Sequence, residues 1–473
     1  MVGMTVRDVP PTRPAEPGTV LSGPEKSGLG QSEAGQPQAA AFHSRCRDLS
    51  ARLAASLGGQ PEHAFPQAAL DLLRRSGFWG AGLAAQAGGP RLTARELLEL
   101  LRAVGRASLP LGRLFEGHVN ALALVSAYGS AEQARRAERD VKTGHLYGVW
   151  NTEGQDGVRL VRQVDPFQPE GTEAARLTLQ GAKTFASGGL HVTRPLLPVE
   201  GPDGRQLALL RTDDPGSVVR EQEGSWQPLG MAATMSVKLD FSGSVLRQSD
   251  LIGAPGDYYR QPMFSAGALR FCAVQLGGAD TLLAETVMYL RTLGRSGDEV
   301  QQLRFAPVWQ GLQAASLALA EGERLERACA AGHSTGEQVT QERLLVQVDA
   351  VRLATEDACL ALLEACERAV GARGLLEPWP FSRLIRDLRM YLRQPAPDAA
   401  RLRLGRWVLE HANGSGAEWG VGLPESEWPE STLPESTLPE STLSESTLPE
   451  STLSGSELGG STDNHGPQEL GSR

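Results

Sequence analysis

The chain has 473 residues and a net charge of -10, which is enough length for two or three domains. Residues 414–473 contain eleven acidic residues and one basic residue, so they carry all of this charge and leave 45 acidic and 45 basic residues elsewhere. A neutral body excludes any electrostatic reason to expect nucleic acid or an anionic membrane as a partner.

Hydropathy and cysteine usage exclude further classes. The chain has no apolar run of about 18 residues, so we expect neither a membrane-spanning helix nor a signal peptide. Its five cysteines are scattered and lack CxxC spacing, and Cys359 and Cys366 are expected to be small buried residues on one helix face. These features predict a reduced, cytoplasmic protein without a structural metal.

The chain opens with a segment that we expect to be disordered, residues 1–38. It is rich in Pro, Gly, Ser, Gln and Thr and shows no apolar period. Residues 39–142 place apolar residues at i, i+3, i+4 and i+7 in several segments, with glycine near their ends. This pattern predicts an N-terminal helical domain.

Residues 143–253 are expected to form a β domain, because their apolar segments are short, alternating and separated by Gly, Asp and Pro. Two segments end in a hydroxyl residue beside glycine: Trp150-Asn151-Thr152-Glu153-Gly154, and GAKTFASGG at residues 181–189. Such ends let backbone and hydroxyl groups approach a planar ligand closely. Ordinary strand ends and turns explain the same residues without any ligand.

Helical spacing returns in residues 254–413, which predict a C-terminal helical bundle. Residues 414–473 follow with a five-residue repeat of the form PESTL. A proline in every fifth place prevents a helix or a central strand, so we expect an acidic, disordered tail. The tail is interpreted as a spacer, and one Leu or Trp per repeat leaves a peptide-docking role open.

Read in order, four motifs resemble the acyl-CoA dehydrogenase family of FAD flavoproteins over residues 45–412. They are Thr152-Glu153, the stretch GAKTFASGG, the stretch LGMAATMSVKLDFSGSVLRQSDLIG at residues 229–253, and the helix with Pro380, Arg383, Arg386-Asp387 and Arg389. The resemblance implies an α+β, mainly α fold: an N-terminal helical domain, a middle barrel-like β domain and a C-terminal four-helix bundle. It also implies a homodimer or homotetramer.

The resemblance implies that FAD is the cofactor and assigns residues to it. Thr152 and Ser187 would hydrogen-bond the flavin ring, and Phe185 would stack near it where the family usually has Trp. Arg291 and Gln301 match residues that reach the FAD pyrophosphate of a neighbouring subunit. The family pattern Arg-x-x-Phe-Gly is replaced here by Arg-Thr-Leu-Gly, and an exposed arginine at a helix end explains Arg291 equally well.

The base that removes the α-proton in this family has no counterpart at its usual places. Gln394 and Pro395 stand where the glutamate follows the Arg-Asp helix. A minority of the family place the base just before an arginine of the first bundle helix, and the matching residues here are Ala268, Leu269 and Arg270. Asp398 is the nearest acid, either a displaced base or, as we favour, the N-cap of the next helix.

Three functions therefore stay open for a small-molecule substrate, with acyl-CoA as one candidate. The first is an FAD-dependent oxidoreductase acting nominally on CH–CH groups of an acyl thioester, with its dehydrogenation chemistry altered or lost. The second is a non-catalytic paralogue that keeps the fold. The third is a flavin monooxygenase, which needs no α-proton base. An electron-transfer flavoprotein or oxygen would be the electron acceptor.

Overall fold

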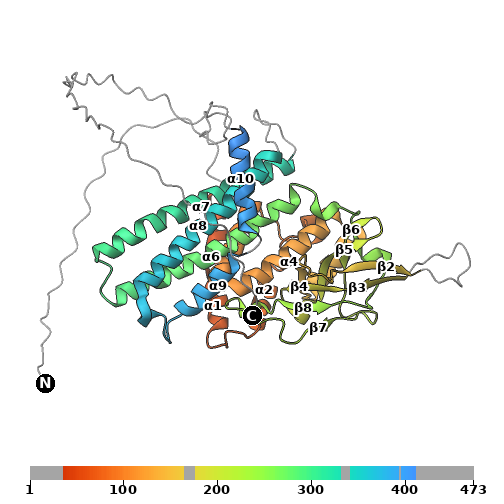
Figure 1. Cartoon of the computed structure of the whole chain (residues 1–473), viewed down its shortest axis with the longest axis horizontal. Coiled ribbons are helices and arrows are strands. Elements are labelled where there is room, and N and C mark those ends of the chain that lie inside the picture. Colours follow the sequence, from red (N-terminus) through yellow and green to blue (C-terminus); the bar gives the residue numbers. More distant parts are fainter. Residues whose placement is uncertain (1–35, 164–175, 332–340, 394–395, 412–473) are drawn as a thin grey trace, which may run out of the picture. The chain divides into compact units, whose positions relative to one another are not determined.

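The computed structural model describes residues 36–163, 176–331, 341–393 and 396–411 (Figure 1). Of the two segments expected to be disordered, residues 1–35 of segment 1–38 and all of segment 414–473 lie outside these residues. The chain begins with a helical region, in which the first helix starts at Gln36 rather than at residue 39. Its helices are α1 (Gln36–Leu57), α2 (Gln67–Arg75), α3 (Ala94–Ala107), α4 (Leu109–Tyr128) and α5 (Ala131–Lys142).

Side-chain caps set where these helices begin. Thr93 and Glu96 form a capping box at the start of α3, and Ser130 and Gln133 form one at the start of α5. Ser108 ends α3 and caps α4, where its hydroxyl accepts from the Leu111 amide at 3.3 Å. Because Ser108 is extended, one residue is enough to separate two long helices and turn the chain.

The middle of the chain forms two sheets. Among the described residues, a seven-stranded sheet has the order β10-β6-β5-β2-β3-β9 with β1 beside β5, and a three-stranded antiparallel sheet has the order β4-β8-β7. The strands are β1 (Tyr147–Val149), β2 (Arg159–Gln163), β3 (Arg176–Gln180), β4 (Ala182–Ala186), β5 (Arg194–Gly201), β6 (Gly204–Leu209), β7 (Arg220–Glu221), β8 (Val237–Asp240), β9 (Val245–Leu246) and β10 (Leu251–Ile252).

Long helices return after the sheets and pack against one another. Within the described residues, α6, α7 and α8 contact each other, α9 packs on α6 and α8, and α10 packs on α8 (Figure 1). Their bounds are α6 (Met263–Thr292), α7 (Glu299–Ala331), α8 (Gln341–Gly374), α9 (Phe381–Tyr391) and α10 (Pro397–His411). The expected fold class, mainly helical with a middle β region and C-terminal helices, is confirmed.

Helices α3 and α6 meet along a seam of glycines. A β-carbon on Gly277 would lie 2.1 Å from the Arg102 carbonyl oxygen, and one on Gly105 would lie 2.3 Å from the Val274 carbonyl oxygen. Only glycine lets the two backbones approach this closely. Beside the seam, Asp280 accepts from Arg102 at 2.7 and 2.8 Å and from Arg106 at 2.8 Å.

Cys359 and Cys366 are buried, as the sequence predicted. Cys46, Cys272, Cys359 and Cys366 are buried and free, and Cys329 is half-buried and free. Burial raises the pKa of Cys366 to about 12, so that thiol behaves as a small apolar group. No helix in the described ranges is long and apolar enough to cross a membrane.

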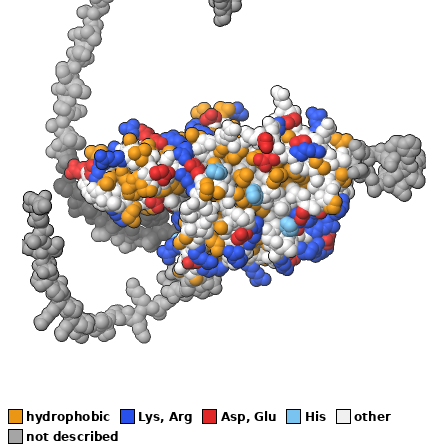
Figure 2. Space-filling view, turned by 90° about the horizontal axis from the view of Figure 1, so that it is seen from below, with side chains coloured by type: hydrophobic (Ala, Val, Ile, Leu, Met, Phe, Trp, Pro, Cys, Tyr) orange, Lys and Arg blue, Asp and Glu red, His pale blue; other side chains and the backbone are white. Residues whose placement is uncertain are grey.

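Exposed apolar side chains gather on the region where α6 ends and α7 runs. Figure 2 shows hydrophobic side chains spread over the helical end of the molecule. The exposed large apolar residues near the end of α6 and along α7 are Met288, Leu293, Val300, Leu303, Trp309 and Leu317. Exposed apolar side chains in such numbers are typical of a region that meets another protein.

The glycine seam predicts opposite effects for two substitutions on α6. We expect Gly277→Ala to lower the free energy of unfolding by about 1–3 kcal/mol, because its methyl group has no space against the α3 backbone. Gly267→Ala is the matched control: its β-carbon would lie 3.6 Å from its nearest neighbour, so helix propensity should add up to about 1 kcal/mol. Denaturant unfolding measures both, and equal effects would contradict the seam.

Candidate functional site

The structure brings together the two strand ends that the sequence analysis singled out. The Thr184 amide donates to the Thr152 carbonyl oxygen at 3.0 Å, which joins the segment after β1 to β4. The Trp150 indole donates to the Ser187 carbonyl oxygen at 3.0 Å. Thr152, Phe185 and Ser187 therefore lie in one region, as three residues that bind one ligand would have to.

Phe185 presents an apolar ring to solvent at the end of β4. Phe185 is 48% exposed, although the next two residues, Ala186 and Ser187, are buried. Its φ is 52°, a left-handed conformation that a phenylalanine rarely adopts and that costs free energy. The ring packs edge-on against Trp226 with 6.1 Å between centroids. An exposed, conformationally strained aromatic residue of this kind fits a planar apolar ligand such as a flavin ring.

Three hydroxyl groups form a directed chain, which we call the hydroxyl relay. Thr234 donates to the Met231 carbonyl oxygen at 2.8 Å, because a carbonyl can only accept. Thr234 Oγ1 lies 2.8 Å from Ser236 Oγ, which lies 2.8 Å from Ser187 Oγ. Since each hydroxyl has one proton, all three contacts are hydrogen bonds only when Ser236 donates to Thr234 and Ser187 donates to Ser236. The Ser187 oxygen then has only acceptor capacity left for a ligand.

A buried ion pair holds the Thr152 segment in place. Lys183 in β4 is fully buried and donates to Glu153 and, at 2.5 Å, to the Pro198 carbonyl oxygen. Arg205 donates to the other oxygen of Glu153 at 2.5 Å. Burial lowers the pKa of Lys183, against the opposing effect of Glu153. The arrangement leaves Thr152 itself exposed beside a rigid anchor.

A second anchor joins the relay loop to the C-terminal helices. The Met231 amide donates to Asp387 Oδ1 at 2.5 Å, and a β-carbon on Gly230 would lie 2.1 Å from the Arg386 carbonyl oxygen. Burial raises the pKa of Asp387 to about 6, although the Met231 amide and Arg383 act in the opposite direction. The Arg386-Asp387 pair of the sequence motif is therefore a positioning element for the loop that carries the relay.

The other predicted residues lie in varied surroundings. Arg291 is exposed near the end of α6, and Gln301 is buried near the start of α7, where its side-chain oxygen accepts from Arg304 at 2.7 Å. Asp398 is exposed and is the second residue of α10. The helix begins at Pro397, since proline suits the first helical position, so the expectation that Asp398 is the N-cap is wrong. Its role as a base stays a prediction.

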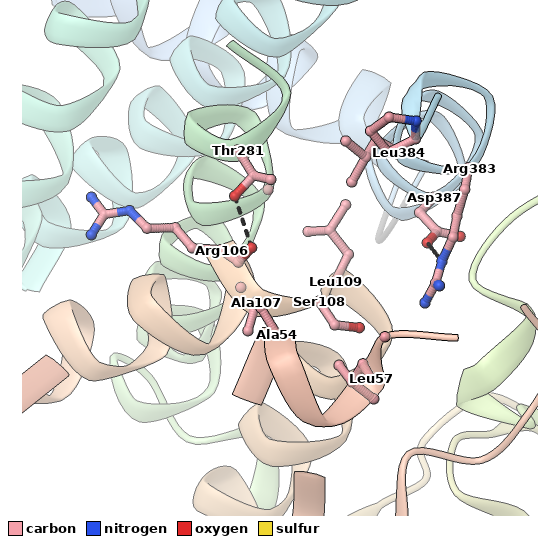
Figure 3. Close-up of a pocket in the computed structure, with 14 residues that line it drawn as sticks. Ala54, Leu57, Arg106, Ala107, Ser108, Leu109, Thr281, Arg383, Leu384 and Asp387 are labelled. Atoms are coloured by element: carbon pink, nitrogen blue, oxygen red, sulfur yellow. Dashed lines mark hydrogen bonds and ion pairs between the residues drawn. The ribbon is translucent and has the colours of Figure 1, made fainter. Parts of the chain in front are cut away.

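A cavity of about 200 Å³ lies elsewhere, between α1, the junction of α3 and α4, α6 and α9 (Figure 3). Arg383 and Asp387 line it from α9, and Figure 3 shows their side chains beside one another. Thr281 on its wall donates to the Arg106 carbonyl oxygen at 2.7 Å. Thr152, Phe185 and Ser187 do not line this cavity, so it is separate from the site at the strand ends.

Sequence reasoning missed several polar residues that the structure draws attention to. Ser236 lies within a quoted motif, but its link to Ser187 spans 49 residues and depends on the fold. Arg113 and Glu116 are charged residues in the otherwise apolar α4, and that spacing was a signal for a buried pair. In the described ranges, no three His, Cys, Asp or Glu residues are grouped as a metal site would require.

Comparison with protein-family models gives two matches. Residues 40–144 match the acyl-CoA dehydrogenase N-terminal domain, and residues 269–393 match the acyl-CoA dehydrogenase C-terminal domain. The matched ranges cover α1 to α5 and most of α6 to α9, on either side of the sheets.

Individual relatives cover most of the chain at low identity. Dibenzothiophene monooxygenase of Mycolicibacterium goodii is 25% identical over 363 residues, which are 71% of this chain and 86% of the relative. FMN-bound TdsC, a dibenzothiophene monooxygenase of Paenibacillus sp. A11-2, has a TM-score of 0.68 at 24% identity, over 78% of this chain and 98% of TdsC. Butyryl-CoA dehydrogenase of Megasphaera elsdenii has a TM-score of 0.67 at 15% identity, over 81% and 100%.

The raised pKa of Asp387 predicts a pH-dependent stability difference. Between pH 4 and pH 6 the folded protein holds a proton on Asp387 that the unfolded chain, with a pKa of 3.8, has released, so this group's contribution to stability falls as pH rises. A shift of about two pKa units corresponds to about 3 kcal/mol. Asp387→Asn keeps the oxygen that accepts from Met231 but cannot titrate.

The measurement is the free energy of unfolding of both proteins at pH 4 and pH 7. We expect the variant to gain up to about 3 kcal/mol relative to the unsubstituted protein on going from pH 4 to pH 7. A difference between the two proteins that does not change with pH would contradict the buried, raised-pKa carboxyl group.

Proposed function

Because the chain belongs to the acyl-CoA dehydrogenase family, we propose that it is a flavin-dependent monooxygenase of this family that oxygenates a small organic molecule. The observation that carries the proposal is the lack of a carboxylate where family members hold the α-proton base. Gln394 and Pro395 follow α9, and Ala268 and Leu269 precede Arg270 on α6. Monooxygenation requires no such base, whereas dehydrogenation loses about 10²–10⁴-fold in rate without one.

Two relatives support this choice among the functions that the sequence left open. The dibenzothiophene monooxygenase of Mycolicibacterium goodii and TdsC each cover most of this chain. TdsC was crystallised with FMN. A flavin is therefore proposed as the cofactor here as well. FAD is the expectation from the family and FMN is the alternative that TdsC supports, and binding of each to the purified protein distinguishes them.

The residues at the strand ends fit a flavin ring. Phe185 offers its exposed face to the ring, Thr152 offers an exposed hydroxyl group, and Ser187 offers an oxygen that accepts. When bound, a reduced flavin supplies the two electrons that insert one atom of O₂ into a substrate and release the other as water. The role of the chain is to bind and orient this group with Ser187 and Thr152 and to cover one face with Phe185.

The hydroxyl relay favours a reduced flavin over an oxidised one. At N5 a reduced flavin carries an N–H and an oxidised flavin has a bare nitrogen, so a flavin bound with N5 at Ser187 would donate to the Ser187 oxygen only in its reduced form. Oxidised flavin would need Ser187 to turn its proton outward, which leaves the Ser187–Ser236 pair without a proton between its two oxygens. Loss of one such hydrogen bond costs about 1 kcal/mol.

Partners follow from this reaction. A protein that consumes reduced flavin needs a separate source of it, so a flavin reductase is the proposed electron-supplying partner, with oxygen as the acceptor. The exposed apolar residues of α6 and α7, which include Trp309 and Leu303, support assembly of the chain into a homodimer or homotetramer. In such an assembly, Arg291 at the end of α6 would contact the flavin of a neighbouring subunit.

Two assays test the proposed function. Purified protein should consume oxygen when supplied with chemically reduced FMN or FAD and a small heteroaromatic or sulfur-containing substrate, and mass spectrometry should find a product heavier by one oxygen atom. Acyl-CoA thioesters should not bleach the oxidised flavin in the absence of oxygen. Bleaching without oxygen would contradict the monooxygenase and support the dehydrogenase. Failure to bind either flavin in either redox state would support the non-catalytic paralogue.

The relay makes a prediction that does not depend on turnover. Under anaerobic conditions, the dissociation constant of the reduced flavin should be about 5–10-fold lower than that of the oxidised flavin, because one hydrogen bond of about 1 kcal/mol separates the two complexes. Ser236→Ala removes the group that fixes the proton of Ser187, so both flavins should then bind about equally. Fluorescence titration measures both constants.

A control isolates the relay from general effects on the β domain. Ser217→Ala removes a hydroxyl that donates to the Arg211 carbonyl oxygen outside the relay, and it should leave both dissociation constants unchanged. A redox preference that survives in Ser236→Ala would show that the direction of the relay does not control which flavin binds.

A further inference from the structure

Helix α4 carries a polar stripe that faces α6 instead of solvent. Arg113, Glu116 and Asn120 lie at i, i+3 and i+7, so they share one face of the helix. Arg113 donates to Glu116 at 2.5 Å, and Asn120 donates to the other oxygen of Glu116. Arg270 on α6 donates to Asn120 at 3.1 Å, which joins the two neighbouring helices (Figure 1).

Tyr391 completes this group, which we call the α4–α6 polar cluster. It is the last residue of α9 and is only 2% exposed. Its hydroxyl group has no hydrogen-bond partner among the described residues, and neither has Arg113 Nε in the cluster. Buried polar atoms are almost always paired, so two unpaired ones in one cluster point to a group that binds there.

Both unpaired atoms are donors. The guanidinium Nε–H of Arg113 can only donate. Burial would lower the pKa of Arg113, but Glu116, Tyr391 and Tyr258 together raise it above its usual value, so the charge persists. Burial, with Glu116, raises the pKa of Tyr391 well above 10, so its phenol keeps its proton. The Tyr391 hydroxyl group can also accept, but Arg113 Nε cannot, so a partner shared by both atoms is an acceptor.

The charges of the cluster favour an acceptor that is anionic. Arg113 and Arg270 bring two positive charges, and Glu116 is held closely by Arg113 and Asn120. The other carboxyl group, Glu326 on α7, lies 3.6 Å from Arg270, and burial raises its pKa against the effect of that arginine. The guanidinium of Arg113 is charged, so its Nε–H would bind an anionic acceptor more strongly than a neutral one.

The cluster is partly exposed at two of its side chains. The Arg113 side chain is 20% exposed and that of Glu326 is 23% exposed, whereas Arg113 Nε and the Tyr391 hydroxyl oxygen are themselves buried. Gly188 follows Ser187 in the turn after β4. A β-carbon on Gly188 would lie 3.4 Å from the side chain of Leu114, the residue after Arg113.

We propose that Arg113 and Tyr391 form a subsite for the oxyanion of a small organic substrate, a carboxylate or a sulfinate. The anion accepts from Arg113 Nε and from the Tyr391 hydroxyl group, and the rest of the molecule extends toward the turn that holds Phe185 and Ser187. The identity of this ligand as the molecule to be oxygenated rests on the proposed function, whereas the binding itself does not.

Calorimetric titration of the purified chain without added flavin tests the binding directly. The probes are propanoate, propane-1-sulfinate and, as the neutral match, propanamide. We expect saturable binding of at least one anion and at least tenfold weaker binding of the amide. The anion that binds more tightly identifies the class, because the two differ in the geometry of their oxygens.

Two substitutions locate the site. Tyr391→Phe removes only the hydroxyl group, and Arg113→Gln removes the charge and the Nε–H; each should weaken binding of the anion at least tenfold, as expected for hydrogen bonds to a charged group. Tyr289→Phe is the matched control, since that buried tyrosine already donates to the Val370 carbonyl oxygen at 3.4 Å, and it should bind as the unsubstituted protein does.

The outcomes separate the subsite from the proposed function. Equal binding of anion and amide, no saturable binding, or unchanged affinity in Tyr391→Phe would each overturn the subsite, the last by showing that the hydroxyl group meets only water. The variant's melting temperature confirms that it is folded. Anion binding that depends on Arg113 and Tyr391, together with no oxygen consumption from reduced flavin, would leave the subsite standing and overturn the monooxygenase.

Discussion

The close contact between α3 and α6 is the constraint on which the rest of the arrangement depends. Gly277 and Gly105 let each helix press against a backbone carbonyl of the other, and Asp280 secures the seam through Arg102 and Arg106. Because a single residue, Ser108, separates α3 from α4, the seam also fixes where α4 begins. Helix α4 then runs between the sheets and the C-terminal helices. Its His118 side chain accepts at Nδ1 from the Tyr147 amide of β1 and donates from Nε2 to the Trp79 carbonyl oxygen in the N-terminal helical region, while its polar stripe faces α6.

Two distant parts of the chain are coupled at the site through short, rigid contacts. Asp387 and the Arg386 carbonyl region hold the loop of Met231, and that loop in turn fixes Thr234 and the direction of the hydroxyl relay. The Arg-Asp motif of α9 therefore acts at a distance from any ligand. It positions the Met231 loop, and that loop sets the direction of the Ser187 proton. A motif can thus stay recognisable in a chain whose following catalytic carboxylate is gone, because the motif serves the architecture and the carboxylate serves one reaction.

Amphipathic periodicity was sufficient to predict the order of helices, sheets and helices, because each long segment buries one face and ends at a glycine, proline or capping residue. The motif order was sufficient to predict that Thr152, Phe185 and Ser187 lie together. The relay was not predictable, since Ser187 and Ser236 meet only through the pairing of β4 with β8. The identity of Asp398 as an N-cap failed because Pro397 takes the first helical position itself. The unpaired hydroxyl group of Tyr391 was also hidden, because a tyrosine in an amphipathic helix is ordinarily just a core residue.

The fixed direction of the relay has a consequence for the lifetime of the complex. A flavin whose N5–H donated to Ser187 in the reduced state would present a bare nitrogen there in the oxidised state, so two acceptors would then face each other. Reversing the relay would break the hydrogen bond to Met231 or the one between the two serines. Binding of the oxidised ring would therefore cost the free energy of one hydrogen bond. The site would therefore bind the reduced flavin as a substrate and release it after oxidation, rather than keep it as a permanently bound cofactor.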